Sequence, residues 1–495
     1  MPRELRERVR VPARVPARVP VLAALALPRQ DRRAEMPDII NLLAGLTDGD
    51  PLDAIRDHRA QAKENAQLSF EALLEPDEPG AFSYRDRYVI AAFTAGLLGS
   101  AAGEEFYRDL LRDEDEAASW TVAELLDEVV VDLDSHGPVR GPFGSYESAA
   151  LTSENVAGPE LSIDANSRDT LGEATSAGIE FAHLLTLHPR DARPEHLARL
   201  LAAGWDEDGI VTLAQLVSFV SFQVRFSAGL AALAHAPAAV TDPVPLRPLT
   251  SGDLRDPGDG QGATASAGSG SPAVSGRSGS TSNPTALAEV GDRVRTYPDL
   301  ARPEVFQQAG LGWVPWIAPV AEADLTEAQR EALIEVGRAK NPYFRLLARD
   351  PAALRARTLT DLDIFFNVTD GVGRAERELA ATAASRLNGC LFCASIHSDR
   401  ASEESGRREV VQRLLDTGTA GRSSLGDPVW DAVVDASVAL SLTPSAFGPE
   451  QVGALREAGL DDADVVDVIG AAAFFNWANR LMLSLGEPEL IAPGK

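Results

Sequence analysis

A low-complexity segment divides the chain near its middle, and no other feature limits the possible folds as strongly. Residues 241–285 are dense in Gly, Ser, Pro and Thr. Such a segment buries too little apolar surface to offset the entropy lost on folding, so we predict a flexible linker. We therefore expect two domains, residues 36–240 and 286–495, each long enough to bury a core.

Both predicted domains are helical. Ala, Leu, Glu and Arg dominate, and apolar residues recur every three or four positions, which is the helical period. Asp350 and Asp427 each precede a proline, the arrangement of an N-cap followed by Pro at the first helical position. Gly389 is typical of the residue that ends a helix, here one beginning near Ala375. The predicted fold class is all-α.

The two halves of the chain also resemble each other. Residues 194–225 align with residues 449–480 through shared Pro-Glu, Ala-Gly, Phe and Arg positions, at an offset of 255 (449 − 194). An earlier match pairs Arg87 with Arg377, at an offset of 290 (377 − 87). The difference of 35 (290 − 255) predicts an insertion in the first half, around residues 137–168. We therefore predict a duplicated helical domain with a degenerate first copy.

The chain has two cysteines, three positions apart, and a histidine follows four positions later. On a helix, Cys390, Cys393 and His397 share one face. Only the second copy carries the cysteines, because Ser100 and Gly103 align with them in the first. A thiol reacts as thiolate, and a helix N-terminus, a nearby base or a second cysteine lowers its pKa. We expect all three of these features to lower the pKa of the cysteines in this chain.

Several roles for the cysteine pair have to be compared. A thioredoxin-type motif should follow a strand in a βαβ unit, and no such unit is evident. A structural zinc site needs four ligands and the chain has no third cysteine, so we expect no metal. A purely structural role would bury three polar groups on one face, which makes a poor core. Glu378, on the preceding helix, is placed to orient His397 in a Glu–His–Cys relay, which favours chemistry.

Two short patterns surround these residues. Residues 377–379 read R-E-L, and residues 388–397 read N-x-C-x-x-C-x-x-x-H. Glu378 precedes Cys390 by twelve positions (390 − 378). This order and spacing resemble the signature of the carboxymuconolactone decarboxylase / AhpD-like alkylhydroperoxidase superfamily. The rest of the second half is consistent with that family, and the first half resembles a degenerate member.

The resemblance implies a thiol-dependent peroxidase for organic hydroperoxides. Cys393 would attack the peroxide, and Cys390 would resolve it as a disulfide and take electrons from a dithiol or protein reductant. Glu378 and His397 would relay protons, and no cofactor is implied. Phe392 stands where the AhpD prototype has a histidine. The family also implies pairing of the two copies and homo-oligomers such as trimers. The alternatives are a decarboxylase-type lyase and a non-catalytic redox sensor.

Composition bears on partners and location. A net charge of −28 argues against nonspecific binding to nucleic acid or anionic membranes. The apolar stretch 211–234 contains two glutamines and Arg225, so it predicts a buried helix and not a membrane span. The sparse use of cysteine predicts a cytoplasmic protein. Residues 1–35, rich in Arg and Pro, are expected to be a disordered basic tail or to precede a natural start at Met36.

Overall fold

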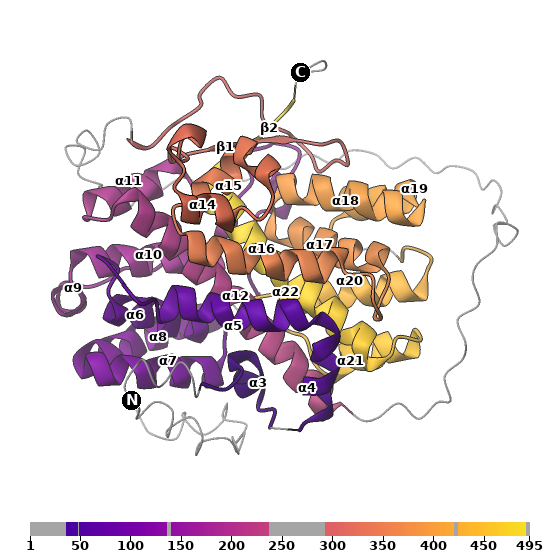
Figure 1. Ribbon diagram of the computed structural model, residues 1–495, viewed down its shortest axis with the longest axis horizontal. Coiled ribbons are helices and arrows are strands. Elements are labelled where there is room, and N and C mark those ends of the chain that lie inside the picture. The colour runs from indigo at the N-terminus through magenta and orange to yellow at the C-terminus, as the bar shows by residue number, and fades with distance from the viewer. Residues whose placement is uncertain (1–35, 48, 136–139, 237–292, 420–423, 492–495) are drawn as a thin grey trace, which may run out of the picture.

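A computed structural model describes residues 36–47, 49–135, 140–236, 293–419 and 424–491, and the statements below concern these residues. The predicted linker and the basic tail lie outside them. The regular secondary structure of the described chain is almost entirely helical, which confirms the all-α prediction (Figure 1).

The helices of the first half are α3 (Ile39–Ala44), α4 (Pro51–Arg56), α5 (Ala60–Leu74), α6 (Tyr84–Leu97), α7 (Ala101–Glu114), α8 (Glu116–Ser135), α9 (Ala165–Leu171), α10 (Glu173–Leu187), α11 (Pro194–Ala202) and α12 (Glu207–His235). Those of the second half are α14 (Glu327–Ala332), α15 (Pro342–Leu347), α16 (Pro351–Phe366), α17 (Arg374–Asn388), α18 (Leu391–Ser405), α19 (Arg408–Thr417), α20 (Pro428–Ser441), α21 (Pro449–Glu457) and α22 (Asp462–Leu485). Short 3-10 turns are η2 (Asp57–Arg59), η3 (Thr152–Glu154), η4 (Pro189–Asp191), η6 (Glu322–Asp324) and η7 (Val336–Lys340).

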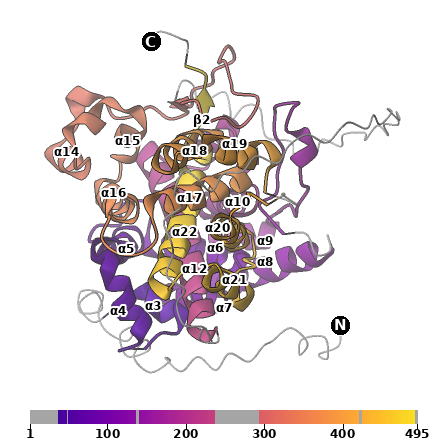
Figure 2. The ribbon, with the colours of Figure 1, turned by 90° about the vertical axis from the view of Figure 1, so that its right-hand side faces the viewer.

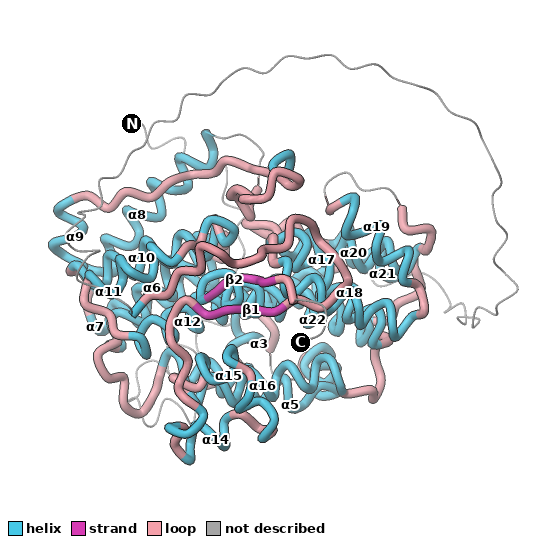
Figure 3. Tube along the Cα trace, turned by 90° about the horizontal axis from the view of Figure 1, so that it is seen from above, coloured by secondary structure: helices cyan, strands magenta, loops and turns pink. Residues whose placement is uncertain are grey.

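A small antiparallel sheet joins the start of the second half to its end. Strand β1 (Gly312–Pro315) pairs with β2 (Gly486–Glu489), with Gly312 opposite Glu489. The pair lies across one end of the central helices (Figure 3). The Trp313 indole donates a hydrogen bond to the Met482 carbonyl, 3.1 Å away, and so anchors β1 on α22. The N-terminal segment of the second half is thereby held beside α18.

The local signals in the sequence produce the expected helix ends. Asp350 accepts a hydrogen bond from the Ala353 amide at the start of α16, and Asp427 accepts one from the Val429 amide at the start of α20. These side chains satisfy amides that have no partner inside the helix. Gly389 ends α17 in the left-handed conformation, at φ +83°. All three predicted boundaries are confirmed.

Helices α12 and α22 pack against each other in the centre of the molecule (Figure 2). Phe222 stacks on Trp477 with ring centroids 5.6 Å apart, and Phe219 meets the same indole edge-on at 5.2 Å. At Gly229 a Cβ atom would lie 2.5 Å from Ile469 Cγ2, so this approach requires glycine. One cluster of buried apolar side chains extends through both halves.

Helix α12 alone, among the described residues, is long and apolar enough to cross a membrane, but 83% of its most apolar window is buried inside the protein. It is therefore a core helix, as the sequence predicts for residues 211–234.

The helix starts follow the two offsets found in the sequence. The difference is 290 for α6/α17 (374 − 84) and α7/α18 (391 − 101), and 255 for α10/α20 (428 − 173), α11/α21 (449 − 194) and α12/α22 (462 − 207). Gly99 and Gly389 are both left-handed, at φ +76° and +83°. Ser100 and Cys390 are both N-caps, with φ/ψ of −90°/94° and −84°/91°. A duplication would explain these matches.

Two arginines that align with each other at the offset of 255 (480 − 225) each form hydrogen bonds with the opposite half. Arg225, on α12, donates to Thr443 Oγ1 (2.7 Å) and the Ser441 carbonyl (3.4 Å), where α20 ends. Arg480, on α22, donates to the Thr186 carbonyl (3.2 Å), near the end of α10. Both guanidinium groups are buried, which lowers the pKa of Arg480 to about 9 and that of Arg225 well below its usual value. Each central helix thus caps a helix of the opposite half.

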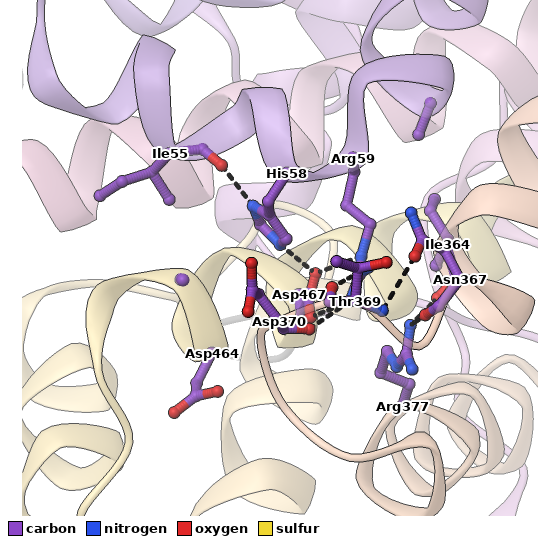
Figure 4. Close-up of polar contacts among 12 residues, drawn as sticks. Ile55, His58, Arg59, Ile364, Asn367, Thr369, Asp370, Arg377, Asp464 and Asp467 are labelled. Atoms are coloured by element: carbon purple, nitrogen blue, oxygen red, sulfur yellow. Dashed lines mark hydrogen bonds and ion pairs between the residues drawn. The ribbon is translucent and has the colours of Figure 1, made fainter.

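A buried ion cluster adds a second link between the halves (Figure 4). Asp467, on α22, accepts hydrogen bonds from Arg59 Nη2 (2.7 Å) and pairs with His58 Nε2 (2.8 Å). Arg59 also donates to the carbonyls of Thr369 (2.8 Å) and Asp370 (3.0 Å), in the loop before α17. The N-terminal part of the first half therefore fixes the loop that leads into the cysteine region.

Candidate active site

The four residues predicted from the sequence lie on two adjacent helices, α17 and α18. Cys390 is the N-cap of α18, Cys393 lies in its first turn, and His397 follows one turn later. Glu378 lies on α17, which packs along α18. The left-handed Gly389 makes the sharp reversal between the two helices possible.

The Glu378 carboxylate and the His397 ring form a direct pair. Glu378 Oε2 lies 2.5 Å from His397 Nδ1. The carboxylate is fully buried and the imidazole nearly so. Because Nδ1–H donates to the carboxylate, Nε2 of the neutral ring is the nitrogen available to accept a proton. The Phe475 ring, with its centroid 4.1 Å from that of His397, packs edge-on against the imidazole.

Neighbouring side chains keep Glu378 ionised in spite of its burial. Burial alone would raise the pKa of this carboxyl, but His397, Arg400 and Arg374 outweigh that effect and hold the pKa below its usual value. Arg374 Nε lies 3.3 Å from Glu378 Oε1. The ionised carboxylate orients the imidazole.

The two thiols are adjacent, reduced and buried. Their sulfur atoms are 2.9 Å apart, and Cys390 and Cys393 expose 2% and 4% of their surface. A disulfide bond of about 2.05 Å would require only a small further approach. Burial raises the pKa of Cys390 well above its usual value, and Cys393 raises it further. The expectation that the pKa of both thiols is lowered is therefore wrong for Cys390, because desolvation outweighs the hydrogen bonds from the Cys393 backbone and the Asn479 side chain.

A buried asparagine network supports the start of α18. Asn388 Nδ2 donates to the side-chain oxygens of Asn476 (3.1 Å) and Asn479 (3.0 Å), both on α22. Asn479 in turn donates to Ser385 Oγ (3.0 Å), and its side chain also acts as a hydrogen-bond partner of Cys390. The sequence pattern includes Asn388, but nothing in it singles out its two partners on α22.

Three further polar residues near the thiols escaped the sequence analysis. The Tyr343 hydroxyl is buried, with no hydrogen-bond partner among the described residues, and both thiols are among the groups whose charge acts on it. The Arg357 guanidinium lies over the Tyr343 ring (5.8 Å) and the Phe474 ring (5.1 Å). Burial raises the pKa of Asp361, which the charges of Arg357 and His397 oppose.

The corresponding positions of the first half contain no thiol. Ser100 Oγ accepts a hydrogen bond from the Gly103 amide and caps α7. Tyr107, aligned with His397, donates to Gln223, and Tyr88, aligned with Glu378, donates to Glu75 Oε1 (2.6 Å). Both phenols are fully buried. Hydrogen-bonded core residues thus occupy these positions in the first half.

Comparison with known families identifies the cysteine region. Residues 351–421, from the start of α16 to just beyond α19, match the Carboxymuconolactone decarboxylase family. This region is a carboxymuconolactone decarboxylase (CMD) family domain. All four predicted site residues lie within the CMD match.

A curated relative supports the CMD assignment. The chain is 25% identical over 115 residues to "Uncharacterized protein YdfG" of Bacillus subtilis (strain 168), which covers 23% of this chain and 76% of the relative. No solved structure matches the chain significantly.

Proposed function

We propose that the protein is a thiol-dependent peroxidase that reduces organic hydroperoxides at the Cys390–Cys393 pair. The observation that carries the proposal is the buried Glu378–His397 pair, one helical turn from Cys393, beside two sulfur atoms 2.9 Å apart. Membership of the CMD family supports enzymatic activity of the decarboxylase or peroxidase type.

The proposed cycle begins with the deprotonation of Cys393. His397 Nε2 accepts the thiol proton, and the Cys393 thiolate attacks the distal oxygen of the hydroperoxide. The O–O bond breaks, Cys393 becomes a sulfenic acid, and His397 returns the proton to the departing alkoxide to give the alcohol. The Cys390 thiol then attacks the Cys393 sulfur, water leaves, and a disulfide forms. Two electrons from a dithiol restore both thiols.

The division of roles between the cysteines follows from their surroundings. Cys393 lies one turn from His397 on the same helix, within reach of a base. Cys390, at the N-cap of α18, lies about two turns from His397 along the helix and suits the resolving role. It becomes reactive once the Cys393 sulfenic acid is adjacent.

The proposal also covers the electron donor, the location and the oligomeric state of the protein. The electron donor is a dithiol or protein reductant in the cytoplasm, and the reaction needs neither a cofactor nor a metal. The duplicated halves pair within the chain, and chains associate further into homo-oligomers such as trimers.

Peroxide consumption by cysteine variants tests the proposal. With cumene hydroperoxide and dithiothreitol, wild-type protein should turn over repeatedly, and Cys393→Ser should lose that activity. In the absence of dithiothreitol, Cys390→Ser should reduce one equivalent and leave a sulfenic acid that dimedone traps. If Cys393→Ser consumes peroxide at the wild-type rate, the proposal is wrong.

The buried Arg357 favours a second candidate, a decarboxylase-type lyase. Its Nε atom is buried with no hydrogen-bond partner among the described residues, and such a cation suits a carboxylate substrate. A lyase would keep its activity after the thiols are alkylated, whereas the peroxidase would not. A redox sensor would form the disulfide with one equivalent of peroxide without turning over.

A further inference from the structure

The Tyr343 hydroxyl is a buried donor without a protein acceptor. The side chain, at the start of α15, is 8% exposed, and its hydroxyl has no hydrogen-bond partner among the described residues. Four other tyrosine hydroxyls all donate to a carbonyl, a carboxylate or a side-chain amide, those of Tyr84, Tyr88, Tyr107 and Tyr297. An unpaired buried hydroxyl costs stability that a phenylalanine would not lose. It therefore indicates a partner that is not part of the chain.

Neighbouring side chains fix the position of this hydroxyl. The Trp313 ring, on β1, meets the Tyr343 ring edge-on with centroids 5.5 Å apart, and the Phe344 ring does so at 5.4 Å. Arg357, on α16, places its guanidinium carbon 5.8 Å from the centroid of the Tyr343 ring. The phenol is therefore held in place before a ligand binds, as electrostatic stabilisation of a transition state requires.

Tyr343 lies beside the cysteine site. The guanidinium of Arg357, which covers the Tyr343 ring, also lies over the Phe474 ring of α22, 5.1 Å from its centroid. The next residue, Phe475, packs its ring against that of His397 at 4.1 Å. The electrostatics agree with this placement, because a charge on either thiol acts on the Tyr343 phenol. The hydroxyl is thus near both the thiols and their base.

The phenol stays protonated, and a positive charge lies behind it. Burial raises the pKa of Tyr343, the charge of Arg357 opposes this effect, and a charge on Cys393 or Cys390 raises the pKa further. The hydroxyl is therefore an O–H donor at neutral pH. Arg357 is 5% exposed, and its Nε atom has no hydrogen-bond partner in the described part of the chain. A donor backed by a buried cation stabilises negative charge that develops in front of it.

We propose that Tyr343 is a catalytic residue of the peroxidase, whose hydroxyl donates a hydrogen bond to the hydroperoxide oxygen that leaves as alkoxide. This inference rests on the proposed function. When the Cys393 thiolate attacks the distal oxygen, the O–O bond breaks and its electron pair goes to the proximal oxygen. Negative charge develops there before His397 delivers the proton, and the Tyr343 hydroxyl stabilises it. Tyr343 keeps its own proton throughout.

Tyr343→Phe removes the hydroxyl and keeps the ring. The loss of protein thiols is followed by quenched flow, without a reductant, with one of two oxidants. tert-Butyl hydroperoxide releases a strongly basic alkoxide, whereas peracetic acid releases the weakly basic acetate. Tyr84→Phe is the matched control, because its hydroxyl, in the first half, donates to the Pro76 carbonyl (2.6 Å). Urea unfolding of each variant reports on the fold.

We expect Tyr343→Phe to slow oxidation by tert-butyl hydroperoxide about 10- to 100-fold, because the alkoxide loses its donor. Oxidation by peracetic acid should slow by less than about threefold, since acetate needs little stabilisation. The urea midpoint of Tyr343→Phe should equal or exceed that of the wild type, because no protein hydrogen bond is lost. Tyr84→Phe should show the opposite pattern, with a lower midpoint and unchanged rates.

An equal loss of rate with both oxidants would mean that the hydroxyl acts on the thiolate or on the fold, and would overturn the inference. Wild-type rates in Tyr343→Phe with both oxidants would contradict the role of Tyr343 and leave the peroxidase intact. Wild-type thiols that survive tert-butyl hydroperoxide would contradict the peroxidase itself, and the role of Tyr343 with it.

Discussion

Glu378 and His397 form a buried hydrogen-bonded pair. The carboxylate holds Nδ1 of the ring, and the imidazole lowers the pKa of the carboxyl. The sequence nominates His397 because it lies four positions after Cys393 on the same helix face, and it nominates Glu378 from its place on the preceding helix. The sequence is not sufficient to predict the direction of the Cys390 pKa, because burial depends on neighbours from other helices.

Substituting Glu378 with glutamine tests this pair. We expect Glu378→Gln to lower peroxide turnover by about 10²- to 10⁴-fold, because the imidazole loses the carboxylate that orients it for proton transfer. Glu403→Gln, at an exposed position on α18, should leave turnover unchanged. Turnover of Glu378→Gln at the wild-type rate would contradict the relay.

The Glu378 carboxyl also predicts that the free energy of unfolding decreases at acid pH. The pKa of this carboxyl in the folded protein lies below its unfolded value of about 4.5. Its contribution to the stability of the fold is therefore present above pH 4.5 and is lost as the pH falls through the folded pKa. Thermal unfolding between pH 6 and 3 should therefore show a smaller loss of stability for Glu378→Gln than for the wild type. An equal loss in both proteins would show that Glu378 is not ionised by its neighbours.

The reversal between α17 and α18 depends on Gly389, which has to satisfy two conditions at once. Its φ of +83° favours glycine, and Arg190 of the other half occupies the space where a side chain would begin. The sequence predicts the first condition from the end of the helical pattern. The second arises only when Arg190, in η4 of the first half, packs against Gly389.

Gly389→Ala compared with Gly406→Ala separates these conditions. Gly406 ends α18 at φ +71°, and no atom lies within 4 Å of the position that a Cβ atom would take, so alanine there meets only backbone strain of about 1 kcal/mol. Gly389→Ala adds a contact at 2.5 Å, and we expect a total loss of about 2–4 kcal/mol. Urea unfolding measures both variants. Equal losses would mean that Arg190 moves away freely.

The two halves of the chain are held together by hydrogen bonds and by packing between their central helices. Arg225 and Arg480 each cap a helix of the opposite half, and α12 and α22 bury their aromatic side chains against each other. We expect residues 293–495, produced alone, to self-associate or aggregate because the face of α22 that packs on α12 becomes exposed. Size-exclusion chromatography with circular dichroism tests this. A folded monomer would show that the halves are independent.

The cluster of His58, Arg59 and Asp467 makes a pH-dependent contribution to the free energy that holds the two halves together. The hydrogen bond to Asp467 raises the pKa of His58 despite the opposing effect of burial. The stabilisation is therefore fully present below the unfolded pKa of about 6.5 and is lost as pH rises through the higher folded pKa. His58→Gln should cost about 1.5–3 kcal/mol at pH 6 and less at pH 9.

Unfolding curves at the two pH values measure this loss. His235→Gln, at an exposed position near the end of α12, is the control and should behave as wild type. A loss for His58→Gln that does not change with pH would mean that His58 is neutral in the folded protein.

The sequence by itself determined the helical class, the helix boundaries around Gly389 and the common helix face of Cys390, Cys393 and His397, because these depend on local periodicity and capping. Only the tertiary structure decided the contact between Glu378 and His397, the burial of the thiols, the asparagine support from α22 and the packing of the first half against Gly389. These features join residues distant in the chain. Their energies depend on desolvation and close packing, and neither can be read from spacing.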